Sequence, residues 1–332
     1  MTYVVLGVLG DLGGDSLGVM TDIQKAAEII QEGGLVAFPT ETVYGLGADA
    51  LNPLAVARIF EVKNRPTFDP LIVHVADLRQ AEILVLKFPE KALRLAGKFW
   101  PGPLTLVLPK STLVPDIVTS SLPGVAIRVP NHSMALELIR ESGRPLAAPS
   151  ANPFGAVSPT TAEHVHRSLG EKVDMILDGG PCGIGVESTV ISFMGKEPVL
   201  LRPGGLPLED IQALIGKVAV EISAADKPLA PGQLPNHYAP RTLMVLDPPP
   251  GALPAGKKIG LLAFQKPDDP SPYSWVEVLS PEGDLREGAA NLFAAMRRLD
   301  EKNLDLLVAR TVPNQGLGRA INDRLTKASQ KA

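Results

Sequence analysis

The sequence predicts an α/β protein with two domains, because short apolar strands alternate with amphipathic helices along most of its 332 residues. The alternation stops once, at residues 223–241, where prolines are frequent and no hydrophobic period is visible. Residues 1–222 therefore predict a twisted mixed sheet with helices, and residues 242–332 a smaller, Rossmann-like α/β domain. We expect the proline-rich segment between them to be a semi-rigid linker.

The elements of the first domain follow from local start and stop signals. A capping residue before an apolar-periodic run marks a helix start, glycine marks its end, and proline ends a strand. In order, these signals predict a strand and loop at 1–20, a helix from Thr21 to Gly33, a strand at 35–38, a helix from Asn52 to Lys63, a strand at 71–75, a helix at 81–100 broken at Pro89, strands at 104–109 and 125–130, a helix at 133–142, a strand at 146–150 and a helix at 162–169 capped by Thr160 or Thr161.

The second domain shows the same alternation on a smaller scale. Strands are predicted at 243–246, 258–264, 275–279 and 304–310. Between the last two strands lies a helix at 284–303, whose apolar side chains recur at helical spacing and predict a stripe that faces the core. That stripe consists of Leu285, Ala289, Leu292, Phe293, Met296 and Leu299.

Composition and charge exclude several classes of protein. With 45% hydrophobic and 20% charged residues, the chain is typical of a soluble globular protein. Its net charge of −4 argues against broad, nonspecific binding of nucleic acid, which requires a basic surface. The single cysteine, Cys182, allows neither an intramolecular disulfide nor a cysteine-built metal cluster. Because the apolar opening is too short to span a bilayer and lacks the basic flank of a signal peptide, we expect a cytoplasmic protein.

Residues 39–44 have the composition of a ligand-binding loop. Thr40, Glu41, Thr42 and Tyr44 place hydroxyls and a carboxylate after a strand, where ligands bind in α/β folds. The next residues, GLGADA, match the G-x-G-x-x-A form of a dinucleotide fingerprint. That fingerprint needs its first glycine directly between strand and helix, and the polar loop intervenes. Dinucleotide binding is therefore the weaker interpretation.

Two further loops carry side chains that suit anion binding. Lys63 and Arg65 lie in a loop fixed by prolines and could clamp a phosphate, although cations are also favoured at a helix C-terminus. Ser150 and Asn152 follow an apolar strand in a loop bounded by prolines. Helix capping does not explain why either residue occurs at its position.

A glycine loop and a strand end add to this set. Residues 178–187 are rich in glycine and lead to Ser188, so backbone N–H groups and a hydroxyl could approach an anion. Arg202 ends an apolar strand, although a surface ion pair is an alternative role for it. No P-loop motif is present. Together the loops favour a phosphorylated, multiply anionic ligand over hydride or metal chemistry.

Seven motifs occur in order and together resemble the YrdC-like family. They are PTETVYGLGADA, KNRP…PLIVHV, FWPGPLTLVL, VAIRVPNH, APSANPFGAVSPTTAEHV, LDGGPCGIGVESTVISF and LLRPGG. The proline-rich linker and the second α/β domain are similar to the long, two-domain form of that family, the L-threonylcarbamoyladenylate synthases. This resemblance implies that the linker at 223–241 could close over the active site as a lid.

The resemblance implies a nucleotidyltransferase. L-threonine, bicarbonate and ATP would give threonylcarbamoyl-AMP and pyrophosphate by adenylyl transfer to the carbamate of threonine. Mg²⁺ would accompany ATP rather than occupy a protein cage, so no protein-bound metal is expected. A separate tRNA threonylcarbamoyl transferase would use the product to modify adenosine 37 of tRNAs that read ANN codons. We therefore expect neither stable tRNA binding by this chain nor a membrane partner.

The resemblance also implies three overlapping groups of site residues. The catalytic group is Lys63, Arg65, Ser150 and Asn152. The L-threonine pocket is Thr40, His74, Arg128, Ser188 and the backbone at Ala148. The ATP-binding group is Lys63, Arg65, Asp69, Ser150, Ser158, Arg202 and Tyr238. Asp69 stands where many relatives have asparagine.

Two other functions are weighed against this one. An RNA-binding module without ATP turnover would bind tRNA with a salt-dependent affinity. A carbamoyl-transfer enzyme of hydrogenase maturation shares the YrdC-like domain, but that type carries cysteine-rich zinc modules, which a single cysteine excludes.

Overall fold

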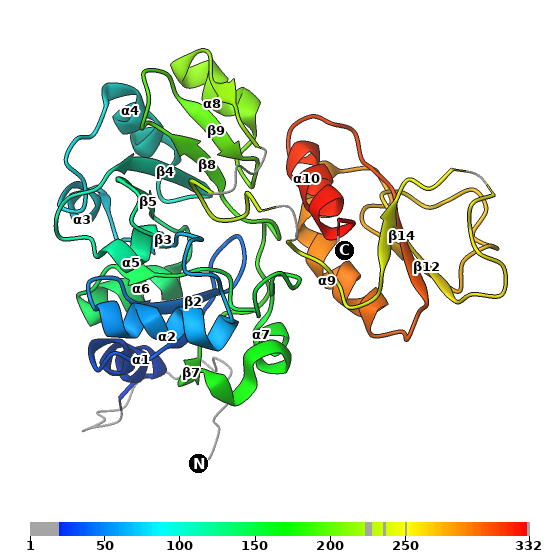
Figure 1. Cartoon of the computed structure of the whole chain (residues 1–332), viewed down its shortest axis with the longest axis horizontal. Coiled ribbons are helices and arrows are strands. Elements are labelled where there is room, and N and C mark those ends of the chain that lie inside the picture. Colours follow the sequence, from blue (N-terminus) through cyan, green and yellow to red (C-terminus); the bar gives the residue numbers. More distant parts are fainter. Residues whose placement is uncertain (1–19, 223–227, 235–236, 250, 331–332) are drawn as a thin grey trace, which may run out of the picture.

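The computed structural model describes residues 20–222, 228–234, 237–249 and 251–330, which form two α/β units (Figure 1). The strand expected near the N-terminus falls outside the described residues, as do parts of the expected linker. Across the described ranges, we find no helix that combines the length and the apolar character needed to cross a membrane.

The larger unit is built on a mixed sheet, as predicted, and this sheet has ten strands. Across the sheet the strands are β10 (Ala219–Val220), β9 (Val199–Arg202), β8 (Thr189–Ser192), β4 (Leu104–Pro109), β5 (Gly124–Arg128), β3 (Ile72–His74), β6 (Leu146–Ala147), β2 (Gly45–Asp49), β1 (Val36–Phe38) and β7 (Met175–Ile176). β3 and β5 run parallel in a register that pairs His74 with Arg128. Two side chains predicted for one site therefore emerge at the same level of adjacent strands.

Both faces of this sheet are covered by helices. The helices of the larger unit are α1 (Asp22–Gln31), α2 (Pro53–Lys63), α3 (Leu78–Glu82), α4 (Glu90–Phe99), α5 (Asp116–Thr119), α6 (Ser133–Ser142), α7 (Ala162–Leu169) and α8 (Leu208–Ile215), with a 3₁₀ turn at Gly170–Lys172. Val36 and Phe38 pack with α1 and α6, whereas Leu35 and Ala37 pack with α2 on the opposite face. A strand buried on both faces needs a continuous apolar run, which explains the sequence of β1.

The predicted helix caps are confirmed. Thr21 and Gln24 form a capping box at the start of α1. The Asn52 side chain accepts hydrogen bonds from the first turn of α2, and Pro53 occupies the first helical position. Of the two threonines considered for α7, Thr161 is the cap.

Two sequence-based expectations were wrong in extent. Of the helix expected at 81–100, only residues 81–82, at the end of α3, and α4 are helical, and Val85 instead forms an isolated bridge with Lys110. The break expected at Pro89 is confirmed, because α4 begins directly after it. The strand expected at 146–150 ends at Ala147, although Ser150 still forms a single bridge with Gly45. An apolar run of this length does not distinguish a helix from a strand or loop when its partners come from elsewhere in the chain.

The GLGADA segment is strand β2, which pairs antiparallel with β1 and was not predicted. A Cβ at Gly47 would lie 2.7 Å from the Phe38 ring, so glycine allows the two strands to approach. Because these glycines lie within a strand and not in a turn before a helix, the dinucleotide interpretation is excluded.

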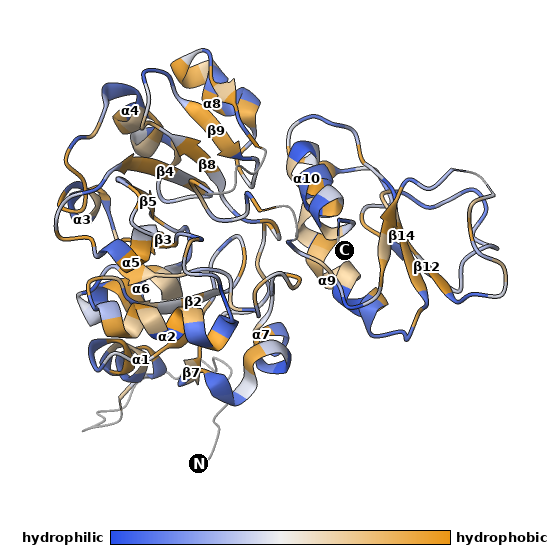
Figure 2. Cartoon of the chain, viewed as in Figure 1, coloured by the Kyte–Doolittle hydropathy of each residue, from blue (hydrophilic) through white to orange (hydrophobic). Residues whose placement is uncertain are grey.

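The smaller unit has a parallel four-stranded sheet, ordered β11 (Met244–Leu246), β14 (Leu306–Ala309), β12 (Ile259–Ala263) and β13 (Trp275–Val278). Its predicted strands and the predicted helix α9 (Leu285–Asp300) are confirmed, whereas α10 (Gly318–Ala328) was not anticipated. Five residues of the predicted stripe are fully buried, and Leu285 is partly buried. Both helices lie on the side that faces the larger unit (Figure 1). Apolar residues gather on the strands and on the inner sides of the helices (Figure 2).

Candidate active site

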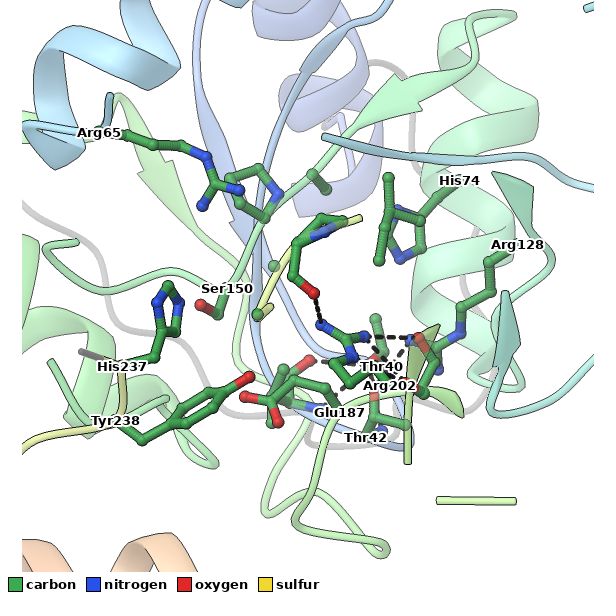
Figure 3. Close-up of a pocket in the computed structure, with 18 residues that line it drawn as sticks. Thr40, Thr42, Arg65, His74, Arg128, Ser150, Glu187, Arg202, His237 and Tyr238 are labelled. Atoms are coloured by element: carbon green, nitrogen blue, oxygen red, sulfur yellow. Dashed lines mark hydrogen bonds between the residues drawn. The ribbon is translucent and has the colours of Figure 1, made fainter. Parts of the chain in front are cut away.

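A pocket lies where the loops after several strands meet the linker (Figure 3). It is lined by Thr40, Thr42, Val43, Gly45, Arg65, Ile72, His74, Arg128, Ala148, Pro149, Ser150, Glu187, Ser188, Arg202, Pro231, Gly232, His237 and Tyr238. The described parts of the linker thus form one side of the pocket.

One end of the pocket is organised by Arg128, at the end of β5. Its Nη1 donates to Thr42 Oγ1 at 2.8 Å, and its Nη2 lies 2.6 Å from Glu41 Oε2. The Thr40 hydroxyl donates to the Val43 carbonyl, so the Thr42 hydroxyl donates to Thr40 Oγ1 at 2.8 Å. This chain of hydrogen bonds fixes the orientation of the guanidinium, which suits recognition of a carboxylate.

A second buried arginine, Arg202, stands at the end of β9. Its Nε and Nη2 donate to the Ser188 carbonyl at 3.1 and 2.9 Å, and Nη2 also donates to Ser188 Oγ. Its Nη1 donates to the carbonyl of Pro231 in the linker at 3.0 Å. Thr105 Oγ1 lies 2.7 Å from Ser188 Oγ and completes the cluster. Arg202 therefore ties a sheet strand to the linker across the pocket.

The loop after α2 presents a buried ion pair. Arg65 donates to the carbonyls of Asp69 and Pro70, and its Nη2 lies 2.9 Å from Asp69 Oδ2. Burial raises the pKa of the Asp69 carboxyl, and the positive charges of Arg65 and Lys63 oppose that shift. An asparagine at this position could not form this ion pair. Asp69 here holds the guanidinium of Arg65 in the pocket wall.

Lys63 lies immediately behind Ser150. Its Nζ donates to the Ser150 carbonyl at 2.5 Å and to the Asn152 carbonyl. Burial, followed by the charge of Arg65, lowers the pKa of Lys63 well below its ordinary value. Through these two hydrogen bonds the side chain fixes the loop that carries Ser150, and a polyanion in the pocket would favour its charged form.

Glu187 is the acidic side chain of the pocket lining, and both of its oxygens are engaged. Oε1 accepts a hydrogen bond from Ser158 Oγ at 2.6 Å, and Oε2 accepts one from Arg324 Nε at 2.8 Å. Burial alone would raise the pKa of the Glu187 carboxyl, but the charges of Arg324 and Arg202 and the hydrogen bonds lower it. The carboxylate is therefore charged, and an arginine of the smaller unit balances it.

His74 is a buried neutral imidazole at the pocket wall. Burial, followed by the charge of Arg128, lowers the pKa of His74 to about 3. Its Nδ1 has no hydrogen-bond partner among the described residues. A buried ring nitrogen at the edge of a pocket is suited to contact a ligand, which favours a binding role over a purely structural one.

The depressed pKa of His74 predicts a loss of stability in acid. Below the unfolded pKa of 6.5, only the unfolded state binds the proton, so the free energy of unfolding falls until the pH reaches about 3. Between pH 7 and pH 4.5, the free energy of unfolding should fall by about 2.5 kcal/mol more in the wild-type protein than in the His74→Gln variant. Urea unfolding of both proteins at each pH measures the difference, and parallel pH dependences would disprove the assignment.

Two of these buried cations lack an acidic partner. Within the described ranges, Lys63 and Arg202 donate to carbonyl and hydroxyl oxygens, and neither has a carboxylate at ion-pair distance. Buried cations without counter-charges are unfavourable. A polyanionic ligand in the pocket would supply the missing charge, and Arg65 is placed to contact it.

The structure brings the predicted site residues together. Those that line the pocket are Thr40, Arg65, His74, Arg128, Ala148, Ser150, Ser188, Arg202 and Tyr238. Those bonded to a lining residue from behind are Lys63, Asp69, Asn152 and Ser158. The sequence assigned no role to Glu187 and Arg324, whereas Thr42 was expected only as part of a ligand-binding loop and His237 only as a possible nucleotide contact from the linker. Thr42 and Glu187 lie within recognised motifs, whereas no local signal marks Arg324.

Comparisons with known proteins show which family this chain resembles. Residues 28–204 match the Sua5–YciO–YrdC family model, described as "Telomere recombination", and residues 206–330 match the model "Threonylcarbamoyl-AMP synthase, C-terminal domain". The chain is 47% identical to the threonylcarbamoyl-AMP synthase of Pyrococcus abyssi over 92% of this chain and 94% of the relative. It is 46% identical to that of Bacillus subtilis over 92% of both chains. The crystal structure of P. abyssi Sua5 complexed with L-threonine superposes with a TM-score of 0.86 at 47% identity, covering 92% of this chain and 94% of that one.

Proposed function

The chain belongs to the Sua5–YciO–YrdC family, and from this premise we propose that it is a threonylcarbamoyl-AMP synthase that uses ATP and L-threonine. One observation carries the proposal into the chemistry of this molecule. The pocket joins a fixed guanidinium suited to a carboxylate, Arg128, to a cluster of cations suited to a polyphosphate, Arg65, Lys63 and Arg202.

We propose that bicarbonate supplies the carbamoyl carbon. The amine of L-threonine and bicarbonate give a carbamate and water. A carbamate oxygen then forms a bond to the α-phosphorus of ATP, the bond between the α-phosphorus and the bridging oxygen breaks, and pyrophosphate leaves. Because both reactants are anions, positioned cations must offset their repulsion and hold them in line.

Each end of the pocket has a role in this reaction. Arg128 would bind the carboxylate of threonine, with Thr40, His74 and Ser188 around the amino acid. Arg65 and Arg202 would stabilise the charge that develops on the phosphates, and Lys63 would fix the loop of Ser150 and Asn152 beside them. The geometry supports these roles because these side chains line one pocket or lie directly behind its lining, and all of them except Ser150 are buried.

Mg²⁺ would enter bound to ATP. Among the residues that the structure describes, no group of three or more His, Cys, Asp or Glu side chains could hold a metal ion. The carboxylate in the pocket lining, Glu187, is engaged by Ser158 and Arg324. Such an environment suits a cation that arrives coordinated by the phosphates of its substrate.

The product would pass to a separate tRNA threonylcarbamoyl transferase, and we place the reaction in the cytoplasm. An RNA-binding module without ATP turnover remains a second candidate. The net charge of −4 disfavours it. We therefore expect tRNA neither to bind stably nor to be needed for turnover of ATP.

A pyrophosphate assay tests the proposed function. Purified full-length protein should release pyrophosphate only when ATP, Mg²⁺, L-threonine and bicarbonate are all present. Labelled bicarbonate should appear in an AMP adduct that also contains threonine. Release that does not depend on threonine would refute the proposal, and salt-dependent binding of tRNA without turnover would favour the RNA-binding alternative.

A further inference from the structure

Helix α10 of the smaller unit reaches the pocket wall with two buried cations. Arg324 is fully buried and donates to Glu187 Oε2 at 2.8 Å and to the Pro203 carbonyl at 2.9 Å. Lys327, three residues later on the same helix face, donates to the Gly232 carbonyl at 2.6 Å. Glu187 and Gly232 both line the pocket, so one helix contacts two of its sides.

An acidic residue on the same helix holds both cations in place. The two oxygens of Asp323 accept hydrogen bonds from Arg324 at 2.6 Å and from Lys327 at 2.7 Å. The guanidinium carbon of Arg324 also lies 5.0 Å from the centroid of the Tyr238 ring. Arg324 therefore contacts the larger unit, the linker and its own helix.

The position of Glu187 needs an explanation. It places a buried carboxylate in the wall of a pocket that otherwise presents cations. Left without a partner, that negative charge would repel a polyphosphate in a site of low dielectric. Among the residues that the structure describes, Arg324 is the cation at ion-pair distance from Glu187, and Ser158 binds the other oxygen of that carboxylate.

We propose that Arg324 is a positioning residue through which the C-terminal domain completes the ATP subsite. The guanidinium of Arg324 balances the charge of Glu187 and helps to orient this carboxylate toward Ser158. The pocket wall beside Arg202 then presents no uncompensated negative charge to a phosphate. Lys327 fixes the linker from the same helix, so the nucleotide subsite has its full form only when α10 is docked. This inference rests on the proposed synthase function and assigns a role in it to the second domain.

The test compares Arg324→Gln with the double variant Glu187→Gln/Arg324→Gln. Removal of one member of a buried ion pair leaves an uncompensated charge, so Arg324→Gln should raise KM for ATP by at least about tenfold. KM for L-threonine should stay within about twofold, because the threonine end of the pocket is untouched. The double variant removes both charges and should restore KM for ATP to within about threefold of the wild-type value.

Arg319→Gln is the matched control. Arg319 lies on the same helix and also bridges the two units, through Glu209 at 2.8 Å, but it is partly exposed and does not line the pocket. Its substitution should leave both KM values unchanged. Equal effects of Arg319→Gln and Arg324→Gln would show that α10 acts only by holding the domains together, which would overturn the inference.

The remaining outcomes are equally decisive. An unchanged KM for ATP in Arg324→Gln, or a double variant that is not rescued, would overturn the role of Arg324. If Arg324→Gln fails to fold, the double variant decides alone, since charge masking predicts a KM for ATP near the wild-type value. Absence of threonine-dependent turnover in the wild-type protein would instead reject the synthase function, so the two failures are distinguishable.

Discussion

Arg65→Ala is expected to reduce threonine-dependent pyrophosphate release by about 10³-fold, the largest effect of any single substitution considered. Arg65 lines the pocket, and its contacts with Asp69 and Pro70 fix its guanidinium there before a ligand arrives. Such preorganised charge is most effective where charge develops during phosphoryl transfer. Steady-state assays with varied ATP measure the loss, and a rate within tenfold of wild type would remove Arg65 from the mechanism.

The loss of activity must be separated from a loss of stability. Without Arg65, Asp69 becomes a buried carboxylate without its ion-pair partner, which should cost about 3–5 kcal/mol of folding free energy. The double variant Arg65→Ala/Asp69→Asn should recover much of that stability and remain inactive. Arg79→Ala, an exposed arginine on α3, is the matched control and should change neither property.

Arg128→Gln should raise the Kd for L-threonine by about 10²-fold, because a paired, charge-assisted contact with a carboxylate is lost. The substitution also leaves Glu41 without its ion-pair partner at 2.6 Å, which adds a repulsive charge at the same end of the pocket. Calorimetric titrations with threonine and with a non-hydrolysable ATP analogue measure the two ends separately. ATP binding should persist, since Arg65 and Arg202 are unchanged.

A comparison within the chain makes this prediction specific. Arg140→Gln, an exposed arginine on α6, should leave threonine binding unchanged. Equal weakening of threonine and ATP binding by Arg128→Gln would show a general collapse of the pocket. That result would contradict a dedicated role for Arg128.

The caps of α1 and α2 and the apolar strands were predictable because their causes are local. Thr21 bonds to Gln24, and Asn52 bonds to residues of the next turn. By contrast, the helix expected over residues 83–89 was wrong, because an apolar run alone does not distinguish a helix from a loop. There Ser111 anchors the chain through the carbonyls of Ile83 and Leu84, and those contacts come from a distant part of the sequence.

The candidate site divides in the same way. The motifs with Thr40, Arg65 and Ser150 were recognisable because reactive side chains in glycine- and proline-bounded loops leave a local pattern. Their convergence in one pocket depends on strand order, such as the parallel register that sets His74 beside Arg128. No pattern near either residue specifies that neighbour.

The sequence by itself determined the α/β class, the chemical groups of the site and the family to which these motifs belong. Only the tertiary structure decided which charges balance one another. Arg324 and Glu187 are 137 positions apart, and the contact between them exists because α10 packs against the larger unit. A buried ion pair requires both partners to lie close together in space, and their separation along the sequence does not predict this. Helix caps and apolar strands, by contrast, depend on residues that are neighbours along the chain.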